Sequence, residues 1–361
     1  MDQITSPKAA IVDLLRLPRP GVLQLDPGAV GESAAGILEV VSYRKTDRVD
    51  AGSCGEAILA HGMGACVGRE AGGVNRWSMR PLALKNILVA TDLTPAHTPA
   101  LRTAARLAAL TGGHLYVVHA IENGGAVDVN EVHARVREAG VDPSIAMDVL
   151  VQRAPPGAVV GQTARQVGAD VVILGPHRHH DPNTPGGTAD RAVRTSAVPC
   201  LIVPVELPLP LRRVLAPIDS SATARGALAV ALSWASALRD RSEHTQVSVL
   251  HVVPYDETAP THDHDADTRH LEAVIAEVRE ELSGIAHVDV QTDVVHEESP
   301  AHAIVDYAAR SRMDLIVIGT RGKSLTNADL LGSVSSVVVR DSRCPVLLVP
   351  PERWAGQSID P

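Results

Sequence analysis

The chain has 361 residues, of which 45% are hydrophobic and 21% are charged, and its formal net charge is −9. This length favours two domains of ordinary size, and the hydrophobic fraction is enough to build packed cores. The acidic balance argues against general nucleic-acid binding, because neutralising phosphates supplies most of that affinity. We therefore expect no nucleic-acid partner.

The hydrophobic pattern also argues against membrane proteins. No apolar run approaches the roughly 20 residues that span a bilayer, and the N-terminus lacks the basic start, apolar stretch and small-residue site of a signal peptide. We expect a cytoplasmic protein that does not bind membranes. Aromatic residues make up only 2%, with no Phe, so the cores must be aliphatic, as in parallel sheets buried on both faces.

Residues 1–80 have a composition of their own, with scattered Gly and Pro. A short helix near 8–16 and an apolar run near 36–43 are the ordered features that the pattern suggests. No β-α-β unit is recognisable there, which predicts a disordered or loosely structured extension. Met79 precedes the first repeated segment, and we interpret it as lying close to the natural start.

The rest of the chain is an internal repeat. LKNILVATD and RRVLAPID are matching apolar runs that end in Asp, and ADVVILG matches MDLIVIG further along. Short apolar runs alternate with longer amphipathic stretches, which is typical of parallel strands joined by helices. Right-handed crossovers then favour a doubly wound sheet. The fold prediction is α/β, with two tandem doubly wound five-stranded parallel-sheet domains of Rossmann-like type.

The repeat sets the predicted domain limits. The first domain covers residues 81–206, with strands at 86–91, 114–121, 145–152, 170–175 and 200–204. The second covers 207–351, with strands at 213–218, 246–253, 287–295, 314–319 and 345–349. The Pro-rich linker 205–213 is short, so the two domains should touch, and 352–361 is a C-terminal tail.

The stretch GTRGKSLTNADLLGS carries the clearest chemical signal. It starts at Gly319, after a predicted strand, and continues through Gly322 to Gly332 and Ser333, where a helix is predicted. Glycine lets a backbone approach a phosphate closely, and the first amides of a helix lack intrahelical acceptors and attract anions. Ser333 is suited to cap that helix and to donate to a phosphate oxygen.

Positive charge supports the same interpretation, because Arg321 and Lys323 lie within this stretch of an acidic protein. The letters GKS also suggest a Walker A loop, but that loop requires a Gly where this chain has Val317. The remaining alternative is a Gly-rich surface loop followed by an ordinary helix cap.

The spacing G-x2-G-x9-G-S, between a fourth strand and a last helix, resembles the nucleotide-binding signature of the ATP-binding universal stress proteins, within the adenine nucleotide α-hydrolase-like group. The resemblance covers about residues 85–350. It implies that the second domain binds ATP, with or without Mg²⁺. The implied ligand-binding residues of this loop are Gly319, Arg321, Gly322, Gly332, Ser333 and Val334.

The resemblance also implies the strand order 3-2-1-4-5, with a crevice between the first and fourth strands. Pro217 and Asp219 would flank the adenosine, and Val252 would contact the base. An N-cap role for Asp219 is compatible with binding. The last strands of the two domains would meet and cover two sheet edges, giving a pseudo-dimer within the chain. A homodimer of chains is the alternative.

The first domain departs from this signature in its loop, GPHRHHDPNTPGGTADRAVR. Gly175 and the pair Gly187-Thr188 match the outer elements, but Arg178 stands where the second Gly should be. Prolines restrict the loop further. A β-carbon at that position obstructs the close approach of backbone to phosphate.

The first strand of this domain also differs, because Asp92 matches the strand-end Asp while Ala90 replaces the Pro before it. We predict that the first domain binds ATP weakly or not at all. The alternative is a modified site that uses His177, Arg178 and His179.

The histidine and cysteine clusters point to no metal or redox chemistry. The His-rich segments 177–180 and 261–270 are interpreted as polar loops with solvated side chains, and no metal site is predicted. Acidic neighbours of the second segment would raise the pKa of its histidines, so pH sensing is the alternative. Cys200 and Cys344 lie beside apolar strands and are predicted to be buried, inert thiols.

The predicted function is ATP binding in stress response or signalling. No nucleophile elbow, HExxH motif or triad is present, so we expect no catalytic residues and at most slow ATP hydrolysis. The nucleotide would order residues 319–333 and change a surface for an unidentified protein partner. Two alternatives are an adenine-nucleotide hydrolase or adenylate-forming enzyme, for which the turn after the strand offers only Arg225, and a structural interaction module without nucleotide.

Overall fold

The computed structural model describes residues 84–121, 127–176, 188–219, 221–240, 242–254, 264–282, 285, 287–320 and 331–351. The predicted N-terminal extension 1–80, the tail 352–361 and the His-rich segment 177–180 lie outside these residues. None of the described helices is long and apolar enough to cross a membrane.

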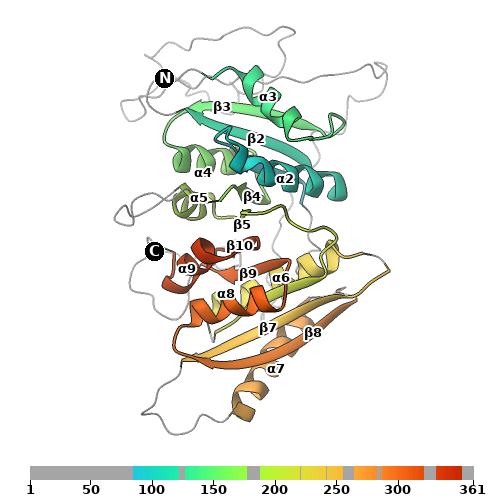
Figure 1. The fold of residues 1–361 in the computed structure, drawn as a ribbon. Helices are drawn as coiled ribbons and strands as arrows, with labels where there is room; N and C mark the ends of the chain where they lie inside the picture. The colour runs from blue at the N-terminus through green and yellow to red at the C-terminus, as the bar shows by residue number, and fades with distance from the viewer. Residues whose placement is uncertain are drawn as a thin grey trace, which may run out of the picture.

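Strands and helices alternate along the described chain (Figure 1). The first half consists of β1 (Asn86–Ala90), η2 (Pro95–His97), α2 (Thr98–Thr111), β2 (His114–Ile121), α3 (Val129–Glu138), β3 (Met147–Arg153), α4 (Pro156–Gln166), β4 (Val171–Leu174), α5 (Thr188–Ser196) and β5 (Cys200–Ile202). The second half consists of β6 (Arg213–Pro217), α6 (Ala222–Ala237), β7 (Thr245–Pro254), α7 (His264–Glu281), β8 (Val288–Glu297), α8 (Pro300–Arg310), β9 (Leu315–Gly319), α9 (Ser333–Asp341) and β10 (Val346–Val349).

The strands form a single ten-stranded sheet in the order β3-β2-β1-β4-β5-β10-β9-β6-β7-β8. Each half therefore has the predicted order 3-2-1-4-5, and all pairs within a half are parallel. At the junction β5 and β10 lie side by side and antiparallel (Figure 1), with Leu201 opposite Leu347. The doubly wound fold class and the meeting of the last strands are both confirmed.

Two hydrophobic layers sandwich the sheet, because successive strand residues point to opposite faces. Val89 belongs to the layer under α2, α3, α6 and α7, and its neighbour Leu88 belongs to the layer under α4, α5, α8 and α9. Each layer contains residues of both halves, so the two hydrophobic clusters both continue across the junction between the halves.

The linker 205–213 packs against the first half. Leu207 is fully buried, and its amide donates to Thr103 Oγ1 of α2 at 3.0 Å. Arg106, also on α2, donates to Glu206 Oε1 at 3.0 Å. The linker is therefore anchored on α2, while the predicted contact between the two halves is made where β5 pairs with β10.

In each half, one carboxylate oxygen accepts hydrogen bonds from two successive backbone amides at the start of the first strand. Asp170 Oδ2 accepts hydrogen bonds from the amides of residues 85 and 86 at 2.7 and 2.9 Å. Asp314 Oδ2 accepts from the amides of residues 212 and 213 at 2.8 and 2.9 Å. This repetition shows that the halves share backbone detail as well as topology.

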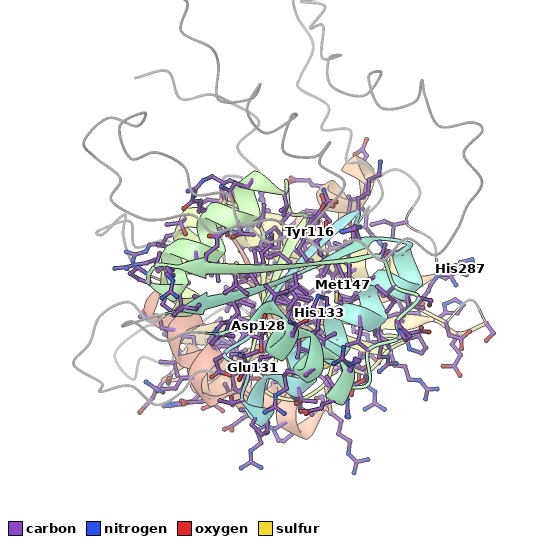
Figure 2. The ribbon with its side chains drawn as sticks, turned by 90° about the horizontal axis from the view of Figure 1, so that it is seen from above. Tyr116, Asp128, Glu131, His133, Met147 and His287 are labelled. Carbon is purple, nitrogen blue, oxygen red and sulfur yellow. The ribbon has the colours of Figure 1, made fainter. Side chains whose placement is uncertain are left out.

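Helix α3 covers the sheet near its free edge. Its N-cap Asp128 accepts from the amide of Asn130 at 3.1 Å, and Glu131 adds negative charge in the first turn, where the helix dipole favours it. Figure 2, which looks down on the molecule, labels both residues at this helix, together with His133 one turn from its start.

One predicted boundary was wrong. Residues 261–270 were interpreted as a polar insert before a helix, but α7 already begins at His264. The buried residues Leu271, Val274, Ile275 and Val278 recur at helical spacing and anchor the helix on the core. Because its first turns extend beyond that apolar stripe, their polar residues gave no helical pattern in the sequence.

The predicted burial of Cys200 is confirmed. It is fully buried, and burial raises the pKa of its thiol to about 12, despite a hydrogen bond with Ser196. Cys344 was also predicted to be buried, but it is only half-buried, because it lies before β10 and not within it; burial raises the pKa of its thiol as well.

Candidate functional site

The hydrogen-bond ladder between the first and fourth strands of the second half ends before their carboxyl ends. The β6–β9 ladder contains only the pairs Val214–Leu315 and Leu215–Ile316. On the other sides, β6 stays paired with β7 as far as Pro217, and β9 stays paired with β10 as far as Gly319. These unpaired strand ends lie where strand order reverses, which is where open α/β sheets bind ligands.

Pro217 explains why this ladder ends early. In a parallel strand, successive amides point to opposite neighbours. The amide of Ile218 donates to the carbonyl of Leu250 on β7 at 2.9 Å, so position 217 faces β9. Proline has no N–H to donate, and the ladder cannot continue there.

Three of the predicted site residues share one face of the sheet at this end. Leu215 and Leu250 belong to the layer under α8 and α9, so by alternation Pro217 and Val252 point to that face too, and Asp219 follows two residues after Pro217. Val252 packs against this layer. Val334, in the first turn of α9, packs against it as well. Residues from three separate parts of the sequence therefore line the same end of the same face.

The turn that carries Asp219 is held from two sides. Asp219 Oδ1 accepts from the amide of Ser221 at 2.9 Å. His251 Nδ1 lies 2.9 Å from the carbonyl oxygen of Ile218, and because a carbonyl only accepts, Nδ1 must carry the proton. Asp219 Oδ2 has no hydrogen-bond partner among the described residues.

His251 was not among the predicted site residues. Its signal was present in the sequence, because a His recurs at the matching place of each repeat, in VVHAI and VLHVV. Its role could not be deduced there, since the bond to Ile218 depends on the pairing of β6 with β7.

Helix α9 begins without a side-chain cap. Its N-cap is Gly332, with φ −57° and ψ 152°, and Ser333 is the exposed first helical residue. The prediction that Ser333 caps this helix is therefore wrong by one position. The glycine already has the extended backbone of a cap, and a sequence pattern does not resolve a helix start to one residue.

The start of α9 is tied to the end of β9. The amide of Gly332 donates to the carbonyl of Thr320 at 2.8 Å, and Ser335 Oγ donates to the same oxygen at 3.2 Å. The amides of residues 333–335 have no acceptor among the described residues. Unpaired amides at a helix start favour an anion. Arg321 and Gly322 lie outside the described residues.

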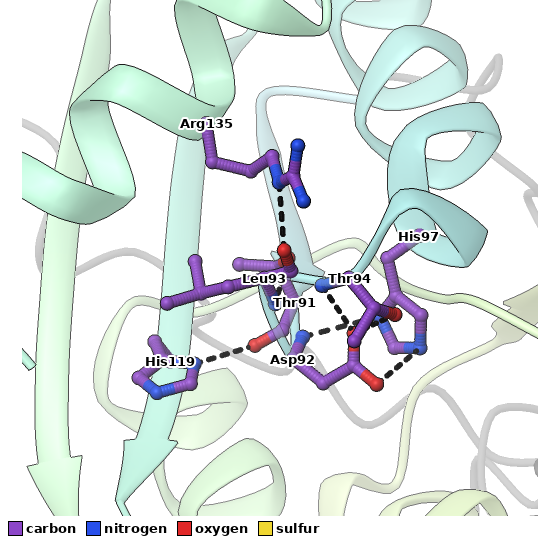
Figure 3. A network of polar contacts seen from close by, with 7 residues as sticks. All are labelled: Thr91, Asp92, Leu93, Thr94, His97, His119 and Arg135. Atoms are coloured by element: carbon purple, nitrogen blue, oxygen red, sulfur yellow. Dashed lines mark hydrogen bonds and ion pairs between the residues drawn. The ribbon is translucent and has the colours of Figure 1, made fainter.

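The first half has the same frame around Asp92 (Figure 3). Asp92 Oδ1 accepts from the amide of Thr94 at 2.9 Å, two residues on, as Asp219 does from Ser221. His119 Nδ1 lies 2.8 Å from the carbonyl oxygen of Thr91 and donates to it, as His251 does to Ile218.

The ladder between the first and fourth strands runs further in this half. It includes the pair Val89–Ile173, one step beyond the last pair between β6 and β9. The amide of Thr91 donates to Val118 on β2 at 3.0 Å, so the amide of Ala90 faces β4. Ala90 has the N–H that Pro217 lacks, and the strands stay together.

His97 lies at the crevice end of the first half. Its Nδ1 accepts from the amide of Asp92 at 3.3 Å, and its Nε2 lies 3.6 Å from Asp92 Oδ2. A β-carbon placed on Gly175, at the end of β4, would stand only 2.5 Å from His97 Cδ2. The ring therefore touches both strand ends. Arg178 and Gly187 lie outside the described residues, and Thr188 is the first residue of α5.

The comparisons with known proteins agree with the repeat. The family model described as "Universal stress protein family" matches residues 83–204 and again 210–350. A universal stress protein of Synechocystis is 30% identical over 141 residues, which make up 38% of this chain and 85% of that protein. One of Methanocaldococcus jannaschii is 44% identical over 62 residues, 17% of this chain.

Coverage differs among these relatives. The matched segments span only 36% of the Methanocaldococcus jannaschii protein and 53% of a Thermus aquaticus universal stress protein. Among solved structures, a universal stress protein from Archaeoglobus fulgidus aligns with a TM-score of 0.52 at 19% identity, covering 75% of this chain and 100% of that chain. That likeness concerns the fold. With both halves matched by one family model, the protein belongs to the universal stress protein family, in its tandem two-domain form.

Proposed function

We propose that the second half holds an adenine nucleotide, ATP with or without Mg²⁺, in the crevice where β6 and β9 part. The observation that supports this proposal is that a hydrogen-bond acceptor lies on one side of the crevice and a set of hydrogen-bond donors on the other. Asp219 Oδ2 and the amides of residues 333–335 have no hydrogen-bond partners among the described residues. A carboxylate requires donors, and helix-start amides require an anion.

An adenine nucleotide meets both requirements. Its ribose hydroxyls and adenine amine can donate to Asp219, and its phosphates can accept from the start of α9. Val252 and Val334, packed on the same layer, offer apolar surface for the base. Gly332 leaves room for the phosphates beside its own backbone. Arg321 and Gly322 complete the proposed binding set, with Gly319 and Ser333.

The proposed output is a nucleotide-dependent surface in stress response or signalling. Thr320 directly follows β9, and its carbonyl accepts hydrogen bonds from the amide of Gly332 and from Ser335 Oγ at the start of α9. A phosphate bound to this helix start would therefore stabilise the hydrogen bonds that join the end of β9 to α9. We infer that residues 319–333 then present a surface to a protein partner. No catalytic base is assigned, so we expect retention of ATP with at most slow hydrolysis.

Asp219→Asn tests the proposal without disturbing the turn, because an Asn Oδ1 can still accept from Ser221. Hydrogen bonds to charged groups contribute about 1.5–3 kcal/mol, so ATP affinity should fall roughly 10- to 100-fold in a calorimetric titration. Asp240→Asn is the matched control, since Asp240 Oδ1 accepts from the amide of Ser242 at 2.9 Å in a similar turn elsewhere. The control should bind ATP as the parent protein does.

Two results would contradict the proposal. One is a parent protein that binds no adenine nucleotide, and the other is an Asp219→Asn variant with unchanged ATP affinity. Release of ADP or pyrophosphate measured on the same samples separates retention from turnover. Sustained release would favour the enzyme alternative.

A further inference from the structure

The first half contains a crevice at the ends of β1 and β4 that has the same surrounding turn and histidine bond as the second half, but a different side chain lies in it. Its Asp92 turn and His119 bond match the Asp219 turn and His251 bond of the second half. Gly175 directly follows β4, at the position that Gly319 takes at the end of β9 in the matching repeat. The frame that the second half offers to a ligand is therefore present twice.

His97 takes the place of a ligand in this frame. Since Nδ1 accepts from the Asp92 amide, the ring proton sits on Nε2, which faces the Asp92 carboxylate at 3.6 Å. The ring thus meets the backbone and the side chain of the strand-end Asp together (Figure 3). Only 16% of the His97 side chain is exposed, and on its other side it lies against Gly175.

The His97 ring does not cap α2, which is what a side chain at an N-cap position usually does. His97 is the N-cap of α2, yet its side chain makes no capping hydrogen bond to that helix. It is turned toward the strand ends instead. Five residues after Asp219, the matching position in the second half is Ala224, a buried alanine in α6 that has no ring to place against the strand ends.

The turn before His97 is strained and braced. Leu93 has φ 64°, a left-handed backbone that a branched side chain adopts at a cost of about 1–2 kcal/mol. Arg135 Nε donates to the carbonyl of Leu93 at 2.7 Å, and the amide of Leu93 donates to Thr91 Oγ1 at 3.0 Å (Figure 3). These bonds fix the path of the chain from β1 into η2, and with it the direction of His97.

We propose that His97 is a built-in plug that closes a second adenine-nucleotide crevice in the first half, and that its removal makes this crevice bind. This inference rests on the proposed function of the second half for the identity of the ligand. It adds one side chain, His97 where the second half has Ala224, to the differences between the halves at positions 90 and 178.

Photolabelling of the full chain with 8-azido-ATP, followed by peptide mapping, tests the plug. His97→Ala should add label to first-half peptides, and excess ATP should compete it away. The reciprocal variant, Ala224→His, should lose at least tenfold of the second-half label. His270→Ala and Ala276→His change exposed helix positions and should leave the labelling pattern unchanged. Thermal unfolding followed by circular dichroism verifies that each variant is folded.

The outcomes separate the two proposals. First-half label in His97→Ala without second-half label in the parent would overturn the proposed function and support the plug. Second-half label alone, in both proteins, would overturn the plug and leave the proposed function standing. If His97→Ala does not fold, His97→Ser takes its place, and an unlabelled first half in that folded variant overturns the inference equally.

Discussion

The two halves of this protein share their framework and differ at two positions near the ends of the first strands. Both have the same strand order, the same carboxylate at the start of the first strand and the same His bond to the strand end. At position 90 the first half has Ala where the second has Pro217, and at position 97 it has His where the second has Ala224. The ladder between the first and fourth strands is one pair shorter in the second half, and in the first half the His97 ring lies against Gly175.

This comparison teaches that a repeated fold can preserve its architecture while its ligand site diverges. The framework depends on many buried aliphatic side chains that form two clusters across both halves. The crevice depends on a few groups at the strand ends, which contribute little to that core. Changes there can alter binding at little cost to stability.

The largest expected effect comes from breaking the junction that joins the two halves. Leu347 is fully buried opposite Leu201, so Leu347→Ala should lower the free energy of unfolding by about 2–5 kcal/mol, measured by denaturant titration. Val205→Ala removes a side chain that is 48% exposed and serves as the control. If both variants unfold like the parent protein, the halves do not depend on shared hydrophobic clusters.

The next largest effect is expected from exchanging the residues at the ends of β1 and β6, which tests whether the Pro there causes the difference between the two ladders. Pro217→Ala supplies the amide that faces β9, so the ladder should extend and ATP affinity should fall several-fold. Ala90→Pro removes the amide that faces β4 and should cost about 1–3 kcal/mol of stability. Calorimetric titration and thermal unfolding measure the two effects. Unchanged ATP affinity in Pro217→Ala would show that the early end of the ladder does not matter for binding.

The smallest expected effect concerns pH and only the first half. Burial, together with the charge of Arg137, holds the pKa of His133 below its usual 6.5. The unfolded chain therefore binds this proton more readily, and the stability that neutral His133 provides is lost as pH falls through about 6.5. His133→Gln should flatten the pH dependence of Tm between pH 7 and pH 5. An identical slope in both proteins would rule out this contribution.

Sequence patterns predicted the strands to within about two residues, because their aliphatic runs are short and bounded by clear turns. The strand order followed from the resemblance, and the structure agrees with it. The start of α7 was missed because its first turns carry polar residues that no apolar stripe marks. The Ser333 cap was misplaced by one residue, since the cap depends on the backbone of Gly332.

The role of His97 could not be predicted at all from sequence. Its contact with Gly175 joins positions 78 apart in the chain, and it exists only because β1 lies beside β4. The sequence interpretation attributed the weak ATP binding that it predicts for the first half to Arg178, in a loop outside the described residues. The proposed plug adds a second cause, next to the ends of β1 and β4.

Native mass spectrometry of the full chain with increasing ATP tests the central claim most directly, because it counts bound nucleotides on each chain. The account predicts a single ATP adduct per chain that is lost in Asp219→Asn and kept in Asp92→Asn. A chain without any adduct, or an adduct that disappears with Asp92 instead of Asp219, would contradict it.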